Sequence, residues 1–107
     1  MNTIKRLQKW YISQCNGDWE HSNGVHLETL DNPGWHVKID LCDTVLENID
    51  FSIVEYGVGE NSEPENNDWL HCEIQNNIFH GYGGPDKLEE IFEKFLDWSD
   101  KHIEQHL

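Results

Sequence analysis

Apolar residues recur at helical spacing near both ends of the chain. At the start, Thr3 can cap a helix and Asn16–Gly17 supplies a stop signal, so we predict a helix from about Thr3 to Cys15. At the other end, Gly84–Pro85 sets a proline at the first helical position, and we predict a second helix over most of the last twenty residues. The apolar positions that define the two helices are Ile4, Leu7, Trp10, Tyr11 and Cys15, and then Leu88, Ile91, Phe92, Phe95, Trp98 and Ile103.

Apolar and polar residues alternate after the first helix, which predicts a β-hairpin. If residues 32–34 (Asn-Pro-Gly) are a three-residue loop with Gly34 in the left-handed region, Asp31 faces Trp35. This register keeps apolar partners on one face and polar partners on the other, whereas a slip of one residue would mix them. The predicted pairs are Val25 with Leu41, Leu27 with Ile39, His26 with Asp40, and Glu28 with Lys38.

Three further strands are predicted in the second half of the chain. Phe51–Tyr56 reads as a strand, and Gly57–Asp68 follows as a long acidic loop. Trp69–Gln75 and Ile78–Gly83 flank Asn76–Asn77, a plausible two-residue turn. The resulting hairpin places Leu70, Cys72 and Ile74 on one face, and it sets Glu73 opposite His80 and His71 opposite Tyr82.

The order helix, strands, helix predicts a single α+β domain over residues 1–107. We expect an antiparallel sheet of about five strands, with the N-terminal and C-terminal helices packed on one face. The polar face of the sheet would then remain open to solvent or to a partner.

The net charge of the chain limits the kind of partner that it can bind. The chain has 21 acidic and 7 basic residues and a formal net charge of −14. Lys38 is the only base between Asn16 and Asp86, so the middle of the chain makes a strongly negative field. Such a field argues against direct binding of nucleic acid or an anionic membrane, and it favours a basic protein partner.

We expect the protein to act in the cytoplasm with reduced thiols. No apolar run approaches the ~18 residues of a membrane span, and the N-terminus lacks the apolar stretch of a signal peptide. Cys15, Cys42 and Cys72 are odd in number and widely spaced. Acidic neighbours oppose thiolate formation at Cys42, and the other two fall on predicted core faces, which leaves no candidate nucleophile.

No cofactor is expected, and only one set of residues offers even a weak metal site. His71 and His80 are diagonal neighbours in the last hairpin and could bridge a metal together with Glu73. A cross-strand His and Glu are more often a solvated pair, so we predict no metal centre. An enzyme would need a pocket that joins these three residues to Tyr82.

Two tryptophans stand beside carboxylates and are candidate anchors for a partner. Trp19 lies between Asp18 and Glu20, although it can equally fold back over the first helix while Asp18 bonds turn amides. Trp69 follows Asp68 and alternates with Leu70, which makes an exposed anchor plausible. Trp35 shares the face of Val37 and Ile39, so we assign it to the core.

Three separated blocks agree in order and spacing with a known family. They read WYxxQCNGDWEH from Trp10, GVxxxTLDNPGWxVxIDL from Gly24 and GGPDKLEEIxEKFLDW from Gly83. In these blocks the chain resembles the Immunity protein 53 family of bacterial polymorphic-toxin systems. The resemblance implies a small, non-enzymatic cytoplasmic protein that binds and neutralises a cognate toxin domain.

For such a protein we expect steric and electrostatic blocking of a basic toxin. A nuclease is one candidate for this toxin, since nucleases bind phosphate. Trp19 and Trp69 are the candidate apolar anchors. The carboxylates expected to pair with toxin Arg and Lys are Asp18, Glu20, Glu60, Glu63, Glu65 and Asp68. Two alternatives are a small enzyme using the His, Glu and Tyr residues of the sheet face, and an acidic nucleic-acid mimic that inhibits a DNA-binding protein.

Overall fold

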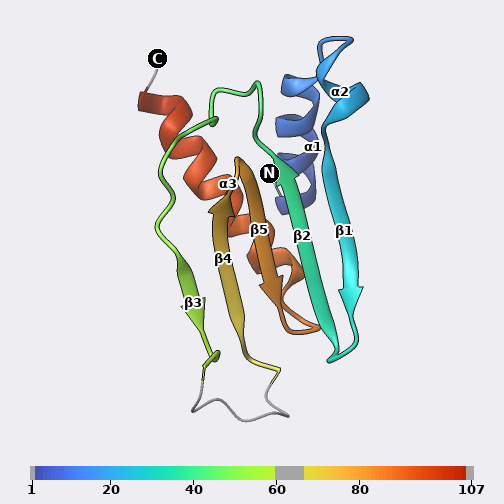
Figure 1. Cartoon of the computed structure of the whole chain (residues 1–107), viewed down its shortest axis with the longest axis vertical. Helices are drawn as coiled ribbons and strands as arrows, with labels where there is room; N and C mark the ends of the chain where they lie inside the picture. The colour runs from blue at the N-terminus through green and yellow to red at the C-terminus, as the bar shows by residue number, and fades with distance from the viewer. Residues whose placement is uncertain (1, 60–66, 106–107) are drawn as a thin grey trace.

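The computed structural model describes residues 2–59 and 67–105, which form three helices and one five-stranded sheet (Figure 1). In chain order the elements are α1 (Thr3–Gln14), α2 (Trp19–Ser22), β1 (Val25–Leu30), β2 (Gly34–Asp40), β3 (Val54–Tyr56), β4 (Leu70–Gln75), β5 (Ile78–Gly83) and α3 (Leu88–Gln105).

All strands of the sheet are antiparallel, and their order is β1-β2-β5-β4-β3. α1 and α3 lie together behind the sheet in Figure 1, and α3 contacts α1, β5 and β4. The predicted α+β fold, with both terminal helices on one face of the sheet, is confirmed. We call the other face the open face. It carries the even-numbered residues of β1, β2 and β5 and the odd-numbered residues of β3 and β4.

The core lies between the sheet and α3. Phe79 of β5 and Phe95 of α3 are fully buried, with ring centroids 5.2 Å apart, and burial of a side chain of this size contributes roughly 2–3 kcal/mol. α3 approaches β5 closely because residue 81 is glycine: a Cβ there would lie 2.3 Å from Cγ2 of Ile91. The other fully buried apolar side chains are Val37, Ile39, Leu41, Leu46, Leu70, Cys72, Ile91 and Leu96.

α1 has the predicted extent, but Thr3 is not its cap. Asn2 caps the helix, and its side-chain oxygen accepts a hydrogen bond from the backbone N–H of Lys5. Thr3 is the first helical residue and is buried against α3, where its hydroxyl lies 3.1 Å from the Glu89 carboxylate and 3.3 Å from that of Glu93. The Thr3 hydroxyl, which was predicted to cap the helix, therefore makes the tertiary contact with α3 instead.

The Trp-bearing turn after α1 is a short helix, α2. Trp19 is 3% exposed, its indole N–H donates to the carbonyl of Cys42 at 2.9 Å, and its ring packs edge-on against Trp10. Of the two interpretations of Trp19, the structure shows the one in which it folds back over α1. Glu20 closes the preceding turn by accepting hydrogen bonds from the backbone N–H groups of Asn16 and Gly17.

The β1–β2 hairpin has the predicted faces but a register two residues away from the predicted one. Leu30 pairs with Gly34, so the loop is residues 31–33, and Gly34 is a strand residue without a positive φ. Gly34 is needed for space, because a Cβ there would lie 2.4 Å from the carbonyl oxygen of Gly83. A shift of two residues preserves which side chains face the core. The observed pairs are Val25 with Ile39, His26 with Lys38, Leu27 with Val37 and Glu28 with His36.

The β4–β5 hairpin matches its prediction. Asn76 and Asn77 form the turn with φ of 55° and 59°, as a two-residue hairpin turn requires. Glu73 pairs with His80, and His71 pairs with Tyr82. Leu70 and Cys72 are fully buried on the core face.

The boundaries of β3 and α3 differ from the predicted ones. β3 is only Val54–Tyr56, and it is tied to α3 by a hydrogen bond from the Tyr56 hydroxyl to Glu90. Burial and this hydrogen bond raise the pKa of Tyr56 to about 12. Pro85 lies in a turn ahead of α3, which begins at Leu88. Within residues 2–59 and 67–105, no helix has the length and apolar character needed to cross a bilayer.

Replacing Gly81 with alanine should destabilise the fold by about 1–3 kcal/mol, because the new methyl group overlaps Ile91 and forces α3 away from β5. The matched control is Gly24→Ala, since a Cβ at residue 24 has no neighbour within 4 Å and φ is not positive there. Urea denaturation monitored by tryptophan fluorescence measures both variants. Equal stability of the two would show that α3 does not pack closely on β5.

Candidate functional site

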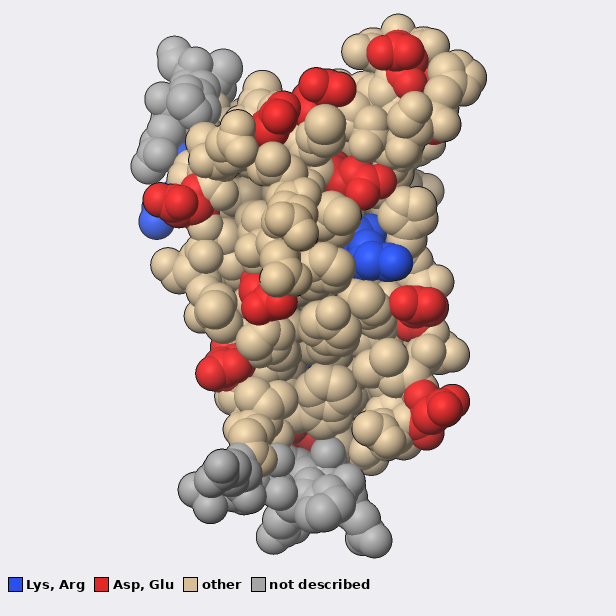
Figure 2. Space-filling model, in the orientation of Figure 1, with Lys and Arg blue, Asp and Glu red and all other residues tan. Residues whose placement is uncertain are grey.

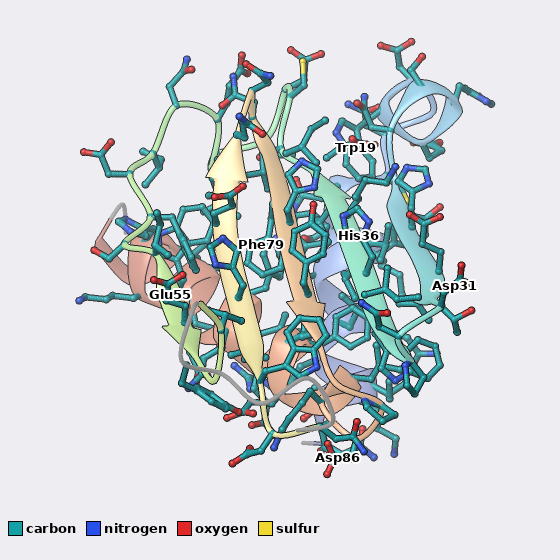
Figure 3. The ribbon with its side chains drawn as sticks, turned by 60° about the horizontal axis from the view of Figure 1, so that its bottom comes forward. Trp19, Asp31, His36, Glu55, Phe79 and Asp86 are labelled. Carbon is teal, nitrogen blue, oxygen red and sulfur yellow. The ribbon has the colours of Figure 1, made fainter. Side chains whose placement is uncertain are left out.

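The open face carries a row of five polar and aromatic side chains that crosses every strand of the sheet. In the order β1, β2, β5, β4, β3 the row is Glu28, His36, Tyr82, His71 and Glu55. We call it the central row. Two rings flank the central Tyr82, and a carboxylate closes each end. Figure 3 labels His36 and Glu55, which lie on this side of the sheet, and Phe79, which is buried on the side of α3.

One half of the central row is held by hydrogen bonds and stacking. Nδ1 of His36 lies 3.0 Å from the Glu28 carboxylate, and Nε2 of His36 lies 3.1 Å from Nδ1 of His80. The ring of His36 stacks on Tyr82 with centroids 4.1 Å apart and an interplanar angle of 15°. The His36 side chain is only 13% exposed, so these contacts fix its orientation.

The other half is built on His71, which lies between two carboxylates. Its Nδ1 is 2.8 Å from Glu55 of β3, and its Nε2 is 3.2 Å from Glu73 of its own strand. Burial disfavours the imidazolium, but the hydrogen bonds to Glu73 and Glu55 outweigh it and raise the pKa of His71. His71 is therefore the histidine of this face that the surroundings favour in the charged form.

His80 has the opposite electrostatic environment. Burial lowers its pKa, and the neighbouring His36 and Lys38 lower it further, while Glu73 acts in the other direction. A neutral His80 can accept or donate in its hydrogen bond with His36. The surroundings of His71 thus favour the charged imidazolium, and those of His80 favour the neutral ring.

Carboxylates outnumber bases on the open face. Its described strand residues include Glu28, Asp40, Glu55 and Glu73, against Lys38 alone. Figure 2, which views this face, shows red side chains spread across it and one blue side chain over β2. Towards β1 the surface is hollowed into a depression lined by His26, Leu27, Glu28, Lys38, Asp40 and Ile78.

The partner-binding residues expected from the sequence do not form one cluster. Asp18, Trp19 and Glu20 lie at α2, at one end of the molecule, whereas Asp68 and Trp69 precede β4 at the other end (Figure 1). Asp18 is exposed, and its side chain makes no capping hydrogen bond. Trp19 is a core residue. Glu60, Glu63 and Glu65 lie outside the described residues.

Trp69 belongs to the open face. Its side chain is half-buried, and its ring reaches across the end of the sheet: a Cβ on Gly34 of β2 would lie 3.2 Å from Cζ2 of Trp69. Glycine at position 34 leaves the space that the indole needs. Asp68, beside it, forms a 2.8 Å ion pair with Lys87.

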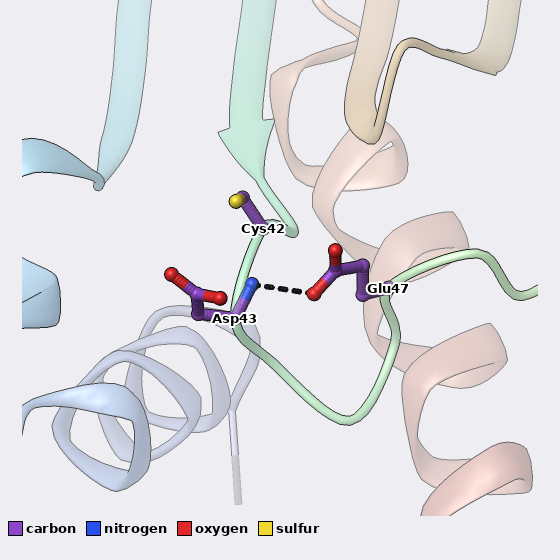
Figure 4. Close-up of side chains that lie close together, drawn as sticks. All are labelled: Cys42, Asp43 and Glu47. Atoms are coloured by element: carbon purple, nitrogen blue, oxygen red, sulfur yellow. Dashed lines mark hydrogen bonds between the residues drawn. The ribbon is translucent and has the colours of Figure 1, made fainter.

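The weak metal candidate of His71, Glu73 and His80 is not brought together as a ligand set. Among the described residues, the three side chains whose ligand atoms all lie within 4.8 Å are instead Cys42, Asp43 and Glu47, after β2 (Figure 4). One oxygen of Glu47 accepts the backbone N–H of Asp43. Asp43 and the other nearby carboxylates raise the pKa of the Cys42 thiol, which agrees with the sequence argument against a thiolate.

His36 is the residue of the open face that sequence reasoning missed. The sequence paired His71 with Tyr82, but it contained no signal that β2 and β5 would be neighbours. The predicted register also paired Glu28 with Lys38 in place of His36. The usable signal was the alternation of side chains along the strand, since His36 lies between Trp35 and Val37, which belong to the core side.

Titration of the two histidines should separate them. We expect His71 to titrate above the usual pKa of about 6.5 and His80 below it. The stability that His71 contributes is fully present below its unfolded pKa and is lost as pH rises through its folded pKa. NMR of the imidazole Cε1–H resonances measures both. Glu55→Gln should lower the pKa of His71, whereas Asp31→Asn, at the distant hairpin loop, should leave it unchanged.

Comparison with known proteins finds one family model whose matched range includes the whole sheet. The model of the family described as Immunity protein 53 matches residues 4–100, a range that contains the open face and all five strands. No curated protein and no solved structure matches the chain. The match covers most of the chain and confirms the resemblance of the three sequence blocks. The chain belongs to the Immunity protein 53 family.

Proposed function

We propose that this chain neutralises a cognate toxin domain by binding a basic surface of it and blocking that surface sterically and electrostatically. Membership of an immunity protein family implies toxin neutralisation by an inhibitor that is not an enzyme. The enzymatic alternative at His71, Glu73, His80 and Tyr82 is therefore set aside. The observation that carries the mode of binding is the net charge of −14.

The charge favours a partner of the opposite sign. Complementary fields steer two proteins together and raise the association rate, and they suppress encounters with like-charged molecules. Nuclease toxins need basic surfaces to hold phosphate, so a nuclease domain fits this chain well. The same field disfavours direct contact with nucleic acid or an anionic membrane. We place the encounter in the cytoplasm, where a toxin that attacks nucleic acid would act.

The described residues proposed to meet the toxin lie towards both ends of the sheet. Asp18 and Glu20 stand at α2, and Asp68 stands beside Trp69 before β4. Glu60, Glu63 and Glu65 belong to the acidic stretch of sequence between β3 and β4. Asp18 and Asp68 are exposed, and exposed carboxylates act mainly on the rate of encounter. The indole of Trp69 is the proposed apolar anchor, because a large half-buried ring can be desolvated at little conformational cost.

Co-expression with the toxic domain encoded next to its gene should restore growth, and the two proteins should elute as a one-to-one complex in size-exclusion chromatography. The control is an unrelated protein whose basic charge is similar to that of the toxin. An acidic nucleic-acid mimic would bind this protein as well as the toxin. Growth arrest in the presence of the chain, with the toxin shown to be active alone, would overturn the proposed function.

Asp18→Lys should slow association with the toxin several-fold at low salt and leave the dissociation rate nearly unchanged, because an exposed rim charge acts on encounter. The difference should fade towards about 0.5 M salt, where screening is short-ranged. Asp50→Lys, in the exposed segment before β3, makes the same change in net charge and is the control. Stopped-flow fluorescence measures the rates. Equal slowing by both variants would mean that only net charge matters.

A further inference from the structure

We propose that the open face of the sheet is the surface that seats the toxin, with toxin Arg and Lys side chains pairing with Glu28, Glu55 and Glu73 around the rings of His36, Tyr82 and His71. This inference rests on the proposed function and gives it a location. The occupant is a basic surface of the toxin domain.

The central row has the arrangement of an interface. Protein interfaces concentrate aromatic side chains at the centre and place charged ones at the rim, where they exclude water from the contact. Here Tyr82 lies between His36 and His71 on the middle strands, and Glu28 and Glu55 stand on the two edge strands. The side chains of Glu28 and Glu55 are 59% and 53% exposed, so a partner can still reach each carboxylate beside its histidine.

The rings are already ordered before any partner arrives. His36 is fixed by Glu28, His80 and the stacked Tyr82, and His71 is fixed by Glu55 and Glu73. Binding to a preorganised surface avoids the entropic cost of immobilising side chains on association. Trp69 extends the same surface with an indole that lies over the end of β2.

Charge decides between possible occupants of this face. The described strand residues of the open face carry four carboxylates and one ammonium group, Lys38, which is a deficit of positive charge that a basic surface would fill. The depression near β1 carries Glu28 and Asp40 beside Lys38, so carboxylates outnumber the ammonium group there as well. A second copy of this chain would bring the same carboxylates face to face, and like charges in contact are unfavourable.

The location also predicts how binding depends on pH. His71 faces Glu55 of β3, Glu73 of β4, and Tyr82 of β5, and its proton neutralises part of the charge that a toxin cation would use. A cation from the toxin therefore competes with the imidazolium. Affinity should rise as pH increases through the titration of His71, and this dependence should weaken in His71→Gln.

The experiment uses the full chain and the neighbouring toxin domain, made harmless by an inactivating substitution. Glu28→Gln with Glu55→Gln should weaken binding at least tenfold in calorimetry. The matched control is Asp31→Asn with Asp50→Asn, two exposed residues outside the strands, which changes net charge equally and should stay within about twofold of the wild type. Addition of toxin should also shift the NMR side-chain resonances of His36, His71 and Tyr82 in the unmodified chain, a readout that needs no variant.

Each outcome has a definite meaning. A tenfold loss confined to the open-face pair, with shifts at the three rings, supports the inference. Two results would overturn the inference but not the proposed function. In the first, the wild type binds tightly, and both double variants bind as tightly or are weakened equally. In the second, the ring shifts appear with rising concentration of this chain alone. A wild-type chain that neither binds nor neutralises the toxin overturns both.

Discussion

The packing of α3 on β5 is the constraint on which the rest of this structure depends. Gly81 lets Ile91 approach the strand, and Phe79 and Phe95 fill the space beside that contact. Because β5 is the central strand, this one contact fixes the helix over the middle of the sheet. α1 is then held against α3 through Thr3 and through Arg6, whose guanidinium lies within 3.1 Å of Asp97 and Asp100.

One-sided burial determines what the other face can be. α1 and α3 take the same side, so the opposite side chains meet water or a partner and must be polar or amphipathic. A face needed only for solubility would be served by scattered charged residues. This one instead places a histidine on each side of Tyr82 and closes the row with a glutamate on each edge strand. The long separation in sequence, from Glu28 to Tyr82, means that only the folded sheet brings the row together.

The two carboxylate populations of the chain have different surroundings. Glu28, Glu55 and Glu73 are held by imidazoles on a rigid sheet, whereas Asp18 stands on an exposed turn and its side chain makes no capping hydrogen bond. Ordered charges can contribute to a defined contact, and exposed ones chiefly shape the field that a partner meets at a distance. An inhibitor that must capture its target quickly and hold it has use for both.

The sequence by itself determined the elements, their faces and the charge. Helical spacing located α1 and α3, alternation separated core from open face in the two hairpins, and Asn76–Asn77 specified the β4–β5 turn with its pairs. These features are local, so neighbouring residues encode them. Only the tertiary structure decided the register at Gly34, the burial of Trp19 and the meeting of His36 with Tyr82. Each of these depends on a contact with a segment distant in the chain. Gly34 lies close to Gly83 and Trp69, the Trp19 indole donates to the carbonyl of Cys42, and β2 pairs with β5.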